Sequence, residues 1–242
     1  MTQQNPILRM TDGIRFVSAQ IEYSVEPLRC YAGQWVAFVP SGPDPVTDPS
    51  GTLARTLISL SPPTQGSVEI FEIDGYQIPY RDVQRLRSRL GFVQGFGGLL
   101  SNRTIRENVA LPAAVHARID VGEERRLVDE TLRRFRLRSV QDLHPHLVDG
   151  YTRWRACLAR ALVLSPKYVV LEGIGDWEMD TGRGVAWDRL KSYHQKGDNL
   201  ICVCASRRNQ GFESWFVENG GILIEYLDRS GRRVSLNGDA PY

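Results

Sequence analysis

Short apolar runs separated by amphipathic helical segments restrict the fold of this 242-residue chain more than any other feature. Residues 34–39, 168–171 and 199–204 are largely apolar and of strand length. Strands that lack polar alternation are buried on both faces of a sheet. Residues 151–164 carry apolar side chains at the i, i+3, i+4, i+7 spacing of a helix. The alternation predicts an α/β fold, with helices covering both faces of a parallel sheet.

The same patterns place the remaining elements. Apolar spacing and stop signals such as Pro62-Pro63 predict the helix boundaries. The sequence predicts helices over 52–60, 81–89, 102–110, 123–136 and 184–194. It predicts strands over 68–73 and 90–93, and a terminal hairpin built from 222–227 and 233–236.

Composition excludes several classes of protein. The 30 Lys and Arg residues nearly balance the 28 Asp and Glu residues, so a dedicated nucleic-acid binder is not expected. No run of about 18 apolar residues is present to span a membrane, and the first twenty residues lack the apolar core of a secretory signal. The cysteines show no metal-binding or redox spacing, so we expect buried free thiols and no metal site. They are Cys30, Cys157, Cys202 and Cys204.

Three segments resemble the nucleotide-binding domain of ABC transporters, in the family's order and spacing. "SPPTQGSVEIFEIDG" (61–75) is similar to the segment that follows the phosphate-binding helix. "GFVQGFGGLLSNRTIRENVALP" (91–112) is similar to the Q-loop region, with Gln94 as its glutamine, and is closest to Mla/MCE-type lipid transporters. "LVDGYTRWRACLARALVLSPKYVVLEG" (147–173) is similar to the signature loop, its helix and the Walker B strand.

The resemblance implies a P-loop NTPase-like fold over residues 1–242. This fold has a RecA-like core, an antiparallel β-subdomain and an α-helical subdomain around 95–150. It also implies a cytoplasmic subunit at the inner face of the membrane, which binds a transmembrane permease and an ATPase-like dimer partner, either identical or different. The family's cofactors are ATP and Mg²⁺.

The segment at the phosphate-binding loop departs from the family pattern G-x-x-x-x-G-K-[ST]. In that pattern backbone N–H groups cradle the phosphates and the lysine reaches the β and γ oxygens. Between Val39 and Leu53 the chain has four prolines and two aspartates, and its first lysine is Lys167. Proline donates no N–H, and a carboxylate about 4 Å from a phosphate charge costs about 1–4 kcal/mol. At best we expect residual contacts from Ser41, Gly42, Ser50, Gly51 and Thr52.

A simpler interpretation of this segment is a surface loop followed by a helix, with Ser50 or Thr52 as the helix cap. Arg55 lies a full helical turn past the loop, so it is not a direct replacement for the missing lysine. We therefore expect no resident cofactor, with ATP and Mg²⁺ only if residual binding persists.

The catalytic positions implied by the resemblance are also altered. Glu172 stands where the family has its metal-supporting aspartate, and Gly173 stands at the general base. Loss of a general base typically lowers a rate by about 10²–10⁴-fold. Ser206 replaces the switch histidine, and the D-loop segment 177–180 keeps only its terminal Asp180. Asp176 is near by sequence, but nothing indicates that it substitutes for the base.

The signature loop and the adenine-stacking position depart as well. Asp149 and Gly150 lie in the loop where the family's signature motif contacts a γ-phosphate; the signature serine is absent, one glycine remains, and an aspartate helix cap is the simpler role for Asp149. Phe16 is the best candidate for the adenine-stacking aromatic residue, although core packing is the better explanation of this residue. Gln94 and its surroundings alone keep the family pattern, which suggests that an interaction surface persists without the reaction centre.

Four hypotheses follow. The first is a pseudo-ATPase with a structural or regulatory role in a transporter, for which lipid transport is one option. The second is the degenerate half of an asymmetric heterodimer. The third is an ATP-binding subunit that retains nucleotide binding or hydrolysis through non-standard motifs. The fourth is a soluble scaffold no longer linked to transport.

Overall fold

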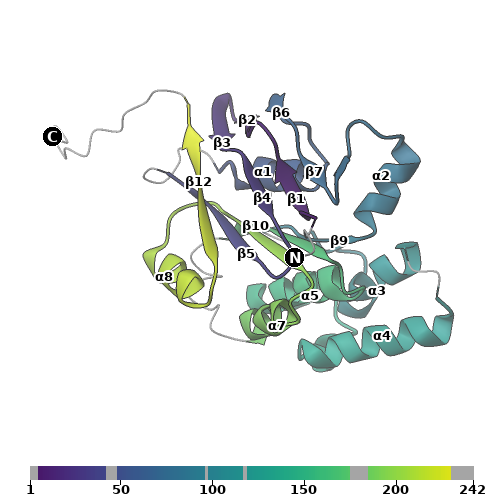
Figure 1. Ribbon diagram of the computed structural model, residues 1–242. Helices are drawn as coiled ribbons and strands as arrows, with labels where there is room; N and C mark the ends of the chain where they lie inside the picture. The colour runs from purple at the N-terminus through teal and green to yellow at the C-terminus, as the bar shows by residue number, and fades with distance from the viewer. Residues whose placement is uncertain (1–4, 42–47, 96–97, 117–118, 175–184, 230–242) are drawn as a thin grey trace.

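The computed structural model describes residues 5–41, 48–95, 98–116, 119–174 and 185–229. An eight-stranded mixed sheet with the order β6-β2-β3-β12-β5-β11-β10-β9 forms the centre, and a four-stranded antiparallel sheet, β4-β1-β7-β8, lies beside it (Figure 1). The strands are β1 (Leu8–Met10), β2 (Ile14–Ser18), β3 (Ile21–Val25), β4 (Leu28–Cys30), β5 (Trp35–Pro40), β6 (Gln65–Gly66), β7 (Glu69–Ile70), β8 (Ile73–Asp74), β9 (Leu90–Val93), β10 (Tyr168–Ile174), β11 (Leu200–Ala205) and β12 (Ile222–Asp228).

Most helices lie on one side of the central sheet, whereas α1 and α2 pack into the core on the other side (Figure 1). They are α1 (Ser50–Leu57), α2 (Tyr80–Arg87), α3 (Ile105–His116), α4 (Val121–Arg134), α5 (Gly150–Leu162), α7 (Val185–His194) and α8 (Gln210–Glu218), with 3₁₀ turns η1 (Arg138–Val140) and η2 (Pro145–Leu147). The fold class predicted from the sequence is therefore confirmed: an α/β core with an antiparallel β-subdomain and a helical subdomain.

The central strands are buried on both faces, as their apolar runs predict. In β5, Trp35 and Ala37 pack into the core that faces α5 and α7, whereas Val36 and Phe38 pack into the core that faces α1 and the antiparallel sheet. Because neighbouring side chains point to opposite faces of a strand, each central strand contributes to both cores. The four cysteines are free and buried, as predicted.

Two tight turns were not predicted, because they lack the usual glycine or asparagine. Residues 68–73 form the hairpin β7–β8 rather than one strand, with Phe71 and Glu72 at φ +52° and +64° in its turn. Ala19 and Gln20 make a similar turn between β2 and β3, at φ +46° and +69°. Left-handed backbone is rarely adopted by such residues, so no local signal marks either turn.

The C-terminal prediction is covered only in part. β12 is the described strand of the proposed hairpin, and it pairs with β5 in parallel and with β3 antiparallel. Residues 233–236 lie outside the described residues. The helix α8 was not predicted from the sequence.

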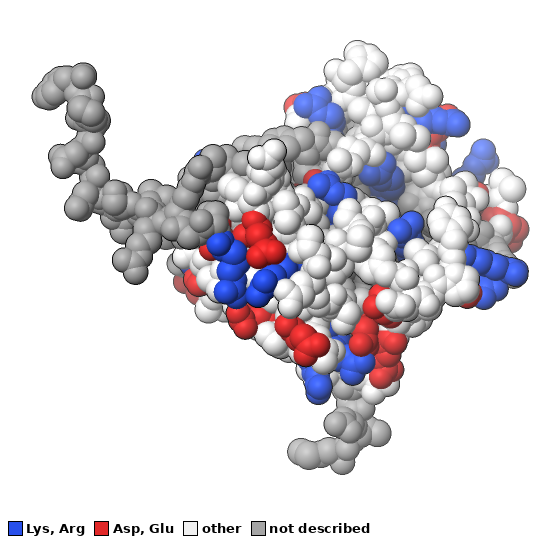
Figure 2. All heavy atoms as spheres, turned by 90° about the horizontal axis from the view of Figure 1, so that it is seen from above, with Lys and Arg blue, Asp and Glu red and all other residues white. Residues whose placement is uncertain are grey.

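None of the described helices is long and apolar enough to cross a membrane. On the face that Figure 2 shows, basic and acidic side chains are interspersed rather than gathered in one basic region. Nucleic-acid-binding domains typically gather Lys and Arg on one face.

Candidate functional site

The carboxyl ends of four parallel strands define the candidate site. β9, β10, β11 and β5 pair in parallel, so their C-terminal ends share one edge of the sheet. Gln94 follows β9, Glu172 and Gly173 end β10, Ser206 follows β11, and Ser41 follows β5. Ligands of open α/β sheets bind beside this edge. The fold therefore brings these sequence-predicted residues to one edge, at which α1 also begins.

Glu172 forms an ion pair with a residue of α1. Its Oε1 lies 3.7 Å from Arg55 Nη1, and its side chain is 14% exposed. Burial raises the pKa of Glu172, the Arg55 guanidinium lowers it, and the nearby Asp48 carboxylate raises it. The position that corresponds to the metal-supporting aspartate thus has an arginine as its charge partner. The sequence did not reveal this pair, because nothing local in α1 indicates which strand end Arg55 faces.

Asp48 holds the N-terminus of α1. The Ser50 main-chain N–H donates to Asp48 Oδ1 at 2.9 Å, and Pro49, at the N-cap position, provides no side-chain hydrogen bond. The prediction that Ser50 or Thr52 caps this helix was wrong, because Ser50 is already its first residue and the Asp48 carboxylate reaches the N–H two residues ahead. An anion is stabilised at a helix N-terminus, and here the chain supplies one itself.

Glycines permit the close approach of these segments. A Cβ built on Gly51 would lie 2.8 Å from Glu172 Oε1, so the Glu172 carboxylate occupies space beside α1 that the Cβ of a larger residue would take. A Cβ built on Gly95 would lie 3.0 Å from the Glu172 main-chain oxygen. Gly173 has a φ of +63°, in the region that favours glycine, and its Cβ position lies 3.7 Å from Ser50 Oγ. Residues 48–51, 94–95 and 172–173 therefore form one compact cluster.

Two buried oxygen atoms in this cluster lack hydrogen-bond partners among the described residues: Ser50 Oγ and Glu172 Oε2. Mg²⁺ prefers oxygen ligands, so these two atoms are the ones that would hold it. Among the described residues, this cluster included, no group of three or more His, Cys, Asp or Glu side chains is arranged for a metal ion.

The described cluster fits a triphosphate poorly. Arg55 is paired with Glu172, and the Ser50 N–H is taken by Asp48. Arg208 approaches the end of β5, where its Nη1 lies 3.5 Å from the Pro40 oxygen, but it is bound to Glu213 and Glu225. A bound polyphosphate would meet two carboxylates and cations that already have partners. The negative charges of the phosphate and of the Asp48 and Glu172 carboxylates would repel one another at contact distance.

Gln94 is exposed, and its loop is held by a residue of α5. Arg160 donates to the Gly98 main-chain oxygen, and a Cβ built on Gly98 would lie 3.1 Å from Gln94 Oε1. Burial lowers the pKa of Arg160. This arginine thus links the loop after β9 to the core, an attachment that the sequence did not indicate.

The signature-like residues lie apart from this cluster. Asp149 caps α5: the Thr152 N–H donates to Asp149 Oδ1 at 2.8 Å, and the Thr152 hydroxyl donates to Oδ2 at 2.8 Å. Gly150 begins the helix. Asp149 lies eleven residues before Arg160, which is about 16 Å along a helix. The helix-cap interpretation of Asp149 is therefore confirmed.

The other predicted residues divide into placed and undescribed ones. The Ser41 N–H donates to the Tyr226 oxygen at 3.0 Å, which ties the end of β5 to β12. Thr52 lies within the first turn of α1, and its main-chain oxygen accepts from Thr56. Phe16 is 1% exposed and stacks on Tyr23 with ring centroids 5.6 Å apart, so core packing explains it. Gly42, Asp176 and residues 177–180 lie outside the described residues.

The chain is similar in sequence to known proteins of one family. A model of the family described as "ABC transporter" matches residues 50–172. The methionine import ATP-binding protein MetN of Geobacillus kaustophilus is 31% identical over 121 residues, 50% of this chain and 35% of that protein. MetN 1 of Acinetobacter baylyi is 33% identical over 121 residues, 50% of this chain and 34% of that protein. The match thus spans about a third of the length of these relatives.

Solved structures of similar fold include two ABC transporter components. The dimeric bacterial ABC transporter cassette MJ0796 aligns with a TM-score of 0.70 and 19% identity, over 90% of this chain and 94% of that chain. CbiO1 of Clostridium perfringens, part of the ABC transporter complex CbiONQ, aligns with a TM-score of 0.62 and 16% identity, over 85% of this chain and 80% of that chain. At this identity the likeness shows the fold.

Proposed function

Because the chain belongs to the ABC transporter family, we propose that it is an ATP-binding-domain-like subunit whose own nucleotide site does not hydrolyse ATP. The observation that carries this proposal is the internal charge pairing at residues 48–55 and 172. Asp48 provides the anion at the N-terminus of α1, and Arg55 provides the cation beside Glu172. The chain itself thus supplies charges of the kind that a phosphate and a metal ion would bring.

The missing side chains support the same proposal. No lysine precedes Lys167, Gly173 has no side chain to act as a base, and Ser206 stands in place of the switch histidine. Each loss removes a different contribution: phosphate binding, proton transfer and γ-phosphate sensing. Removing a group that transfers protons typically lowers the rate by about 10²–10⁴-fold, so turnover would be small even with nucleotide present.

The partners follow from the family. We propose that the chain binds a transporter permease and a second ATPase-like chain, since the similar structures include a dimeric cassette and a part of a transporter complex. Gln94 is exposed on a loop held by Arg160, which suits a contact with such a partner. A subunit of this kind would lie at the cytoplasmic side of the membrane.

The names of the relatives bear on the transported compound. Residues 91–112 predict a lipid transporter, whereas the relatives reported above are named for methionine import. We therefore favour a small polar solute over a lipid as the compound carried by the transporter.

A second candidate is an ATP-binding subunit that holds nucleotide without turnover. It is favoured by the two buried oxygen atoms without partners, Ser50 Oγ and Glu172 Oε2, which would hold Mg²⁺. Glu172 would then exchange its Arg55 partner for a metal ion. This candidate keeps the same partners and differs only in ligand occupancy.

Titration of the purified chain with MgATP and with a non-hydrolysable ATP analogue, combined with a phosphate-release assay, tests the proposal. We expect no saturable binding in the micromolar range and no phosphate release above that of buffer. Binding without release would support the second candidate. Micromolar binding with turnover that is lost in Glu172→Gln would overturn both. The variant is the control, because activity from a contaminating ATPase would survive it.

A further inference from the structure

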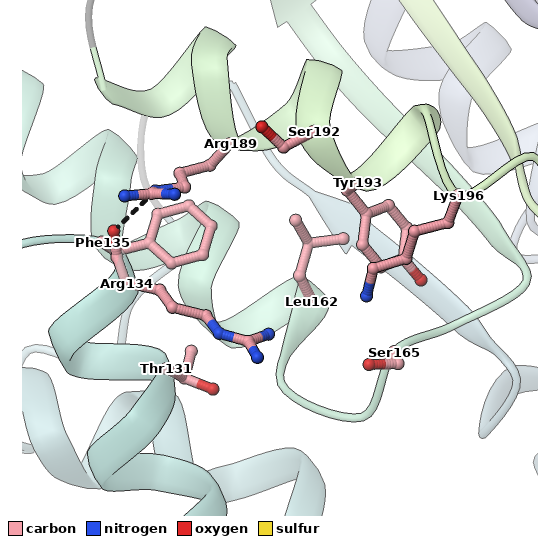
Figure 3. Close-up of a pocket in the computed structure, with 9 residues that line it drawn as sticks. All are labelled: Thr131, Arg134, Phe135, Leu162, Ser165, Arg189, Ser192, Tyr193 and Lys196. Atoms are coloured by element: carbon pink, nitrogen blue, oxygen red, sulfur yellow. Dashed lines mark hydrogen bonds between the residues drawn. The ribbon is translucent and has the colours of Figure 1, made fainter.

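A pocket lies where the C-terminal ends of α4, α5 and α7 converge (Figure 3). Its volume is about 230 Å³. Phe135, Leu162 and Tyr193 form an apolar floor and are buried, with exposures of 4%, 8% and 8%. Two of these three residues are aromatic, and such rings offer apolar faces to a ligand.

Cationic and hydroxyl groups surround this floor. Figure 3 shows the Arg134 guanidinium and the Lys196 ammonium group on either side of the space next to Leu162, with the Ser165 side chain nearby. Arg189 lies at the far end of the pocket, where its Nε donates to the Arg134 main-chain oxygen at 2.9 Å. The residues that line the pocket include no carboxylate.

Some of these cations are held in position. Lys196 Nζ lies 5.2 Å from the centroid of the Tyr193 ring, and the Tyr193 hydroxyl donates to the Pro166 oxygen. Arg134 pairs with Glu130 one turn earlier, where both side chains are about half exposed (51% and 41%). Exposed pairs of this kind contribute little, so a ligand displaces the carboxylate readily.

Cations near helix C-termini often serve only to balance the helix dipole and its free carbonyl groups. Here other donors already satisfy several carbonyl oxygens of these ends. The Phe135 oxygen accepts from Arg155, the Tyr193 oxygen accepts from Asn199 at 2.9 Å, and the Leu162 oxygen accepts from the Ser165 N–H at 2.9 Å. These carbonyl oxygens therefore do not need the Arg134 and Lys196 head groups, and the pair that a ligand must displace at Arg134 is the exposed one with Glu130.

The size and location of the pocket limit that ligand. A volume of about 230 Å³ is below the range of about 300–1,000 Å³ typical of sites for drug-sized molecules, so the ligand is small. Ser165 precedes β10, whereas Glu172 lies at its other end, four residues past Tyr168 and so about 13 Å along the strand. The pocket is thus separate from the residues at the carboxyl edge of the sheet.

We propose that this pocket binds a small organic phosphate monoester. The dianionic phosphate lies between Arg134 and Lys196 and accepts from the Ser165 hydroxyl, and the apolar substituent lies on Phe135 and Tyr193. Guanidinium groups bind phosphate through paired N–H donors, and lysine binds it as a point charge. This inference does not depend on whether the chain hydrolyses ATP.

Calorimetric titration of the full chain with phenyl phosphate tests the proposal. We expect saturable binding, tighter than that of inorganic phosphate or benzoate. The substitutions Arg134→Gln and Lys196→Gln should each weaken it by about five- to tenfold. Arg133→Gln removes the same charge from the neighbouring position of α4, outside the pocket, and should change the affinity less than twofold.

Three results would overturn the proposal. One is the absence of saturable binding at millimolar phenyl phosphate. Another is equal weakening by Arg133→Gln and Arg134→Gln, which would indicate general charge attraction. The third is equally tight binding of a simpler anion. Inorganic phosphate that binds as tightly as phenyl phosphate would show that the apolar floor has no role, and benzoate that does so would show that the dianionic phosphate has none. Circular dichroism of each variant confirms that loss of binding is not loss of folding.

Discussion

Arg55 Nη1 lies 3.7 Å from Glu172 Oε1, and this ion pair joins the first helix to the end of β10. The two residues are far apart in the sequence, and Gly51 leaves the space that lets the Glu172 carboxylate approach α1. Because this pair sets the charges at the candidate site, substitutions of Arg55 and Glu172 test the description of that site.

The Glu172→Gln variant tests the effect of burial on the pKa of Glu172. Burial raises this pKa above its ordinary value of 4.5, so the folded chain keeps the proton to higher pH than the unfolded chain does. The contribution of Glu172 to stability is full below about pH 4.5 and is lost as pH rises through the folded pKa. We expect Glu172→Gln to gain stability relative to the natural chain between acidic and neutral pH. Denaturant unfolding at a series of pH values measures the difference in stability between the variant and the natural chain. A difference that does not change with pH would contradict the raised pKa of Glu172.

Removing Arg55 should have the opposite effect at neutral pH. Arg55→Met leaves the largely buried Glu172 carboxylate without its cationic partner, and we expect a loss of only about 1–2 kcal/mol, since the arginine is 41% exposed. The loss should shrink at low pH, where Glu172 is protonated. Adding Glu172→Gln to Arg55→Met should restore most of the stability. A double variant as unstable as Arg55→Met would show that the arginine acts through packing.

Asp48→Asn tests whether the carboxylate at the start of α1 excludes external anions. The amide oxygen can still accept from the Ser50 N–H, but the negative charge is gone. We expect a loss of stability of about 0.3–1 kcal/mol, from the helix dipole, and increased affinity for pyrophosphate. Titration with pyrophosphate measures the second effect. Asp142→Asn removes an exposed carboxylate elsewhere and should leave pyrophosphate binding unchanged.

Gly51→Ala tests the close approach of α1 and β10. The added Cβ would lie 2.8 Å from Glu172 Oε1, so the end of this side chain must move, and we expect a loss of about 1 kcal/mol, the low end of the range for overpacking. Gly211→Ala, in α8, is the matched control, because its Cβ would meet only Asn209 Oδ1 at 3.4 Å. Replacing a helical glycine without strain should stabilise the chain by about 0.5–1 kcal/mol. Equal effects of the two substitutions, measured by thermal unfolding, would contradict the packing described.

Asp149→Ala tests the cap of α5. Hydrogen bonds from the Thr152 N–H and hydroxyl lower the pKa of Asp149 below 3.8, so its contribution is present above that pH and is lost as pH falls through the folded pKa. We expect a loss of about 1–2 kcal/mol at pH 7 and a smaller one in acid, with no change in nucleotide binding. Urea unfolding at both pH values measures the loss. A change in nucleotide binding would instead support a signature-like role.

Local sequence patterns predicted much of the fold. The apolar runs that became β5, β10 and β11 were identified because strands buried on both faces need no polar alternation. The helix α5 was identified from its apolar spacing, and its Asp149 cap from the residue type. The turns at Ala19-Gln20 and Phe71-Glu72 were missed, because neither pair carries the residues that ordinarily permit a positive φ.

The sequence predicted which residues lie at the candidate site, but not which of their charged side chains pair with one another. The sequence placed Gln94, Glu172 and Ser206 at strand ends, and parallel pairing brings such ends together. It did not indicate that Asp48 caps α1, that Arg55 faces Glu172, or that Arg160 holds the loop after Gln94. Side-chain partners across elements depend on how α1 and α5 are oriented on the sheet.

The sequence by itself determined the buried strands β5, β10 and β11, the helix α5 and the absence of a lysine before residue 167, because these are properties of the chain read locally. Only the tertiary structure decided which charges neutralise one another at the carboxyl edge, and which cations converge where α4, α5 and α7 end. The reason is physical: electrostatic interactions depend on distances in space, and packing sets those distances between residues far apart in the chain.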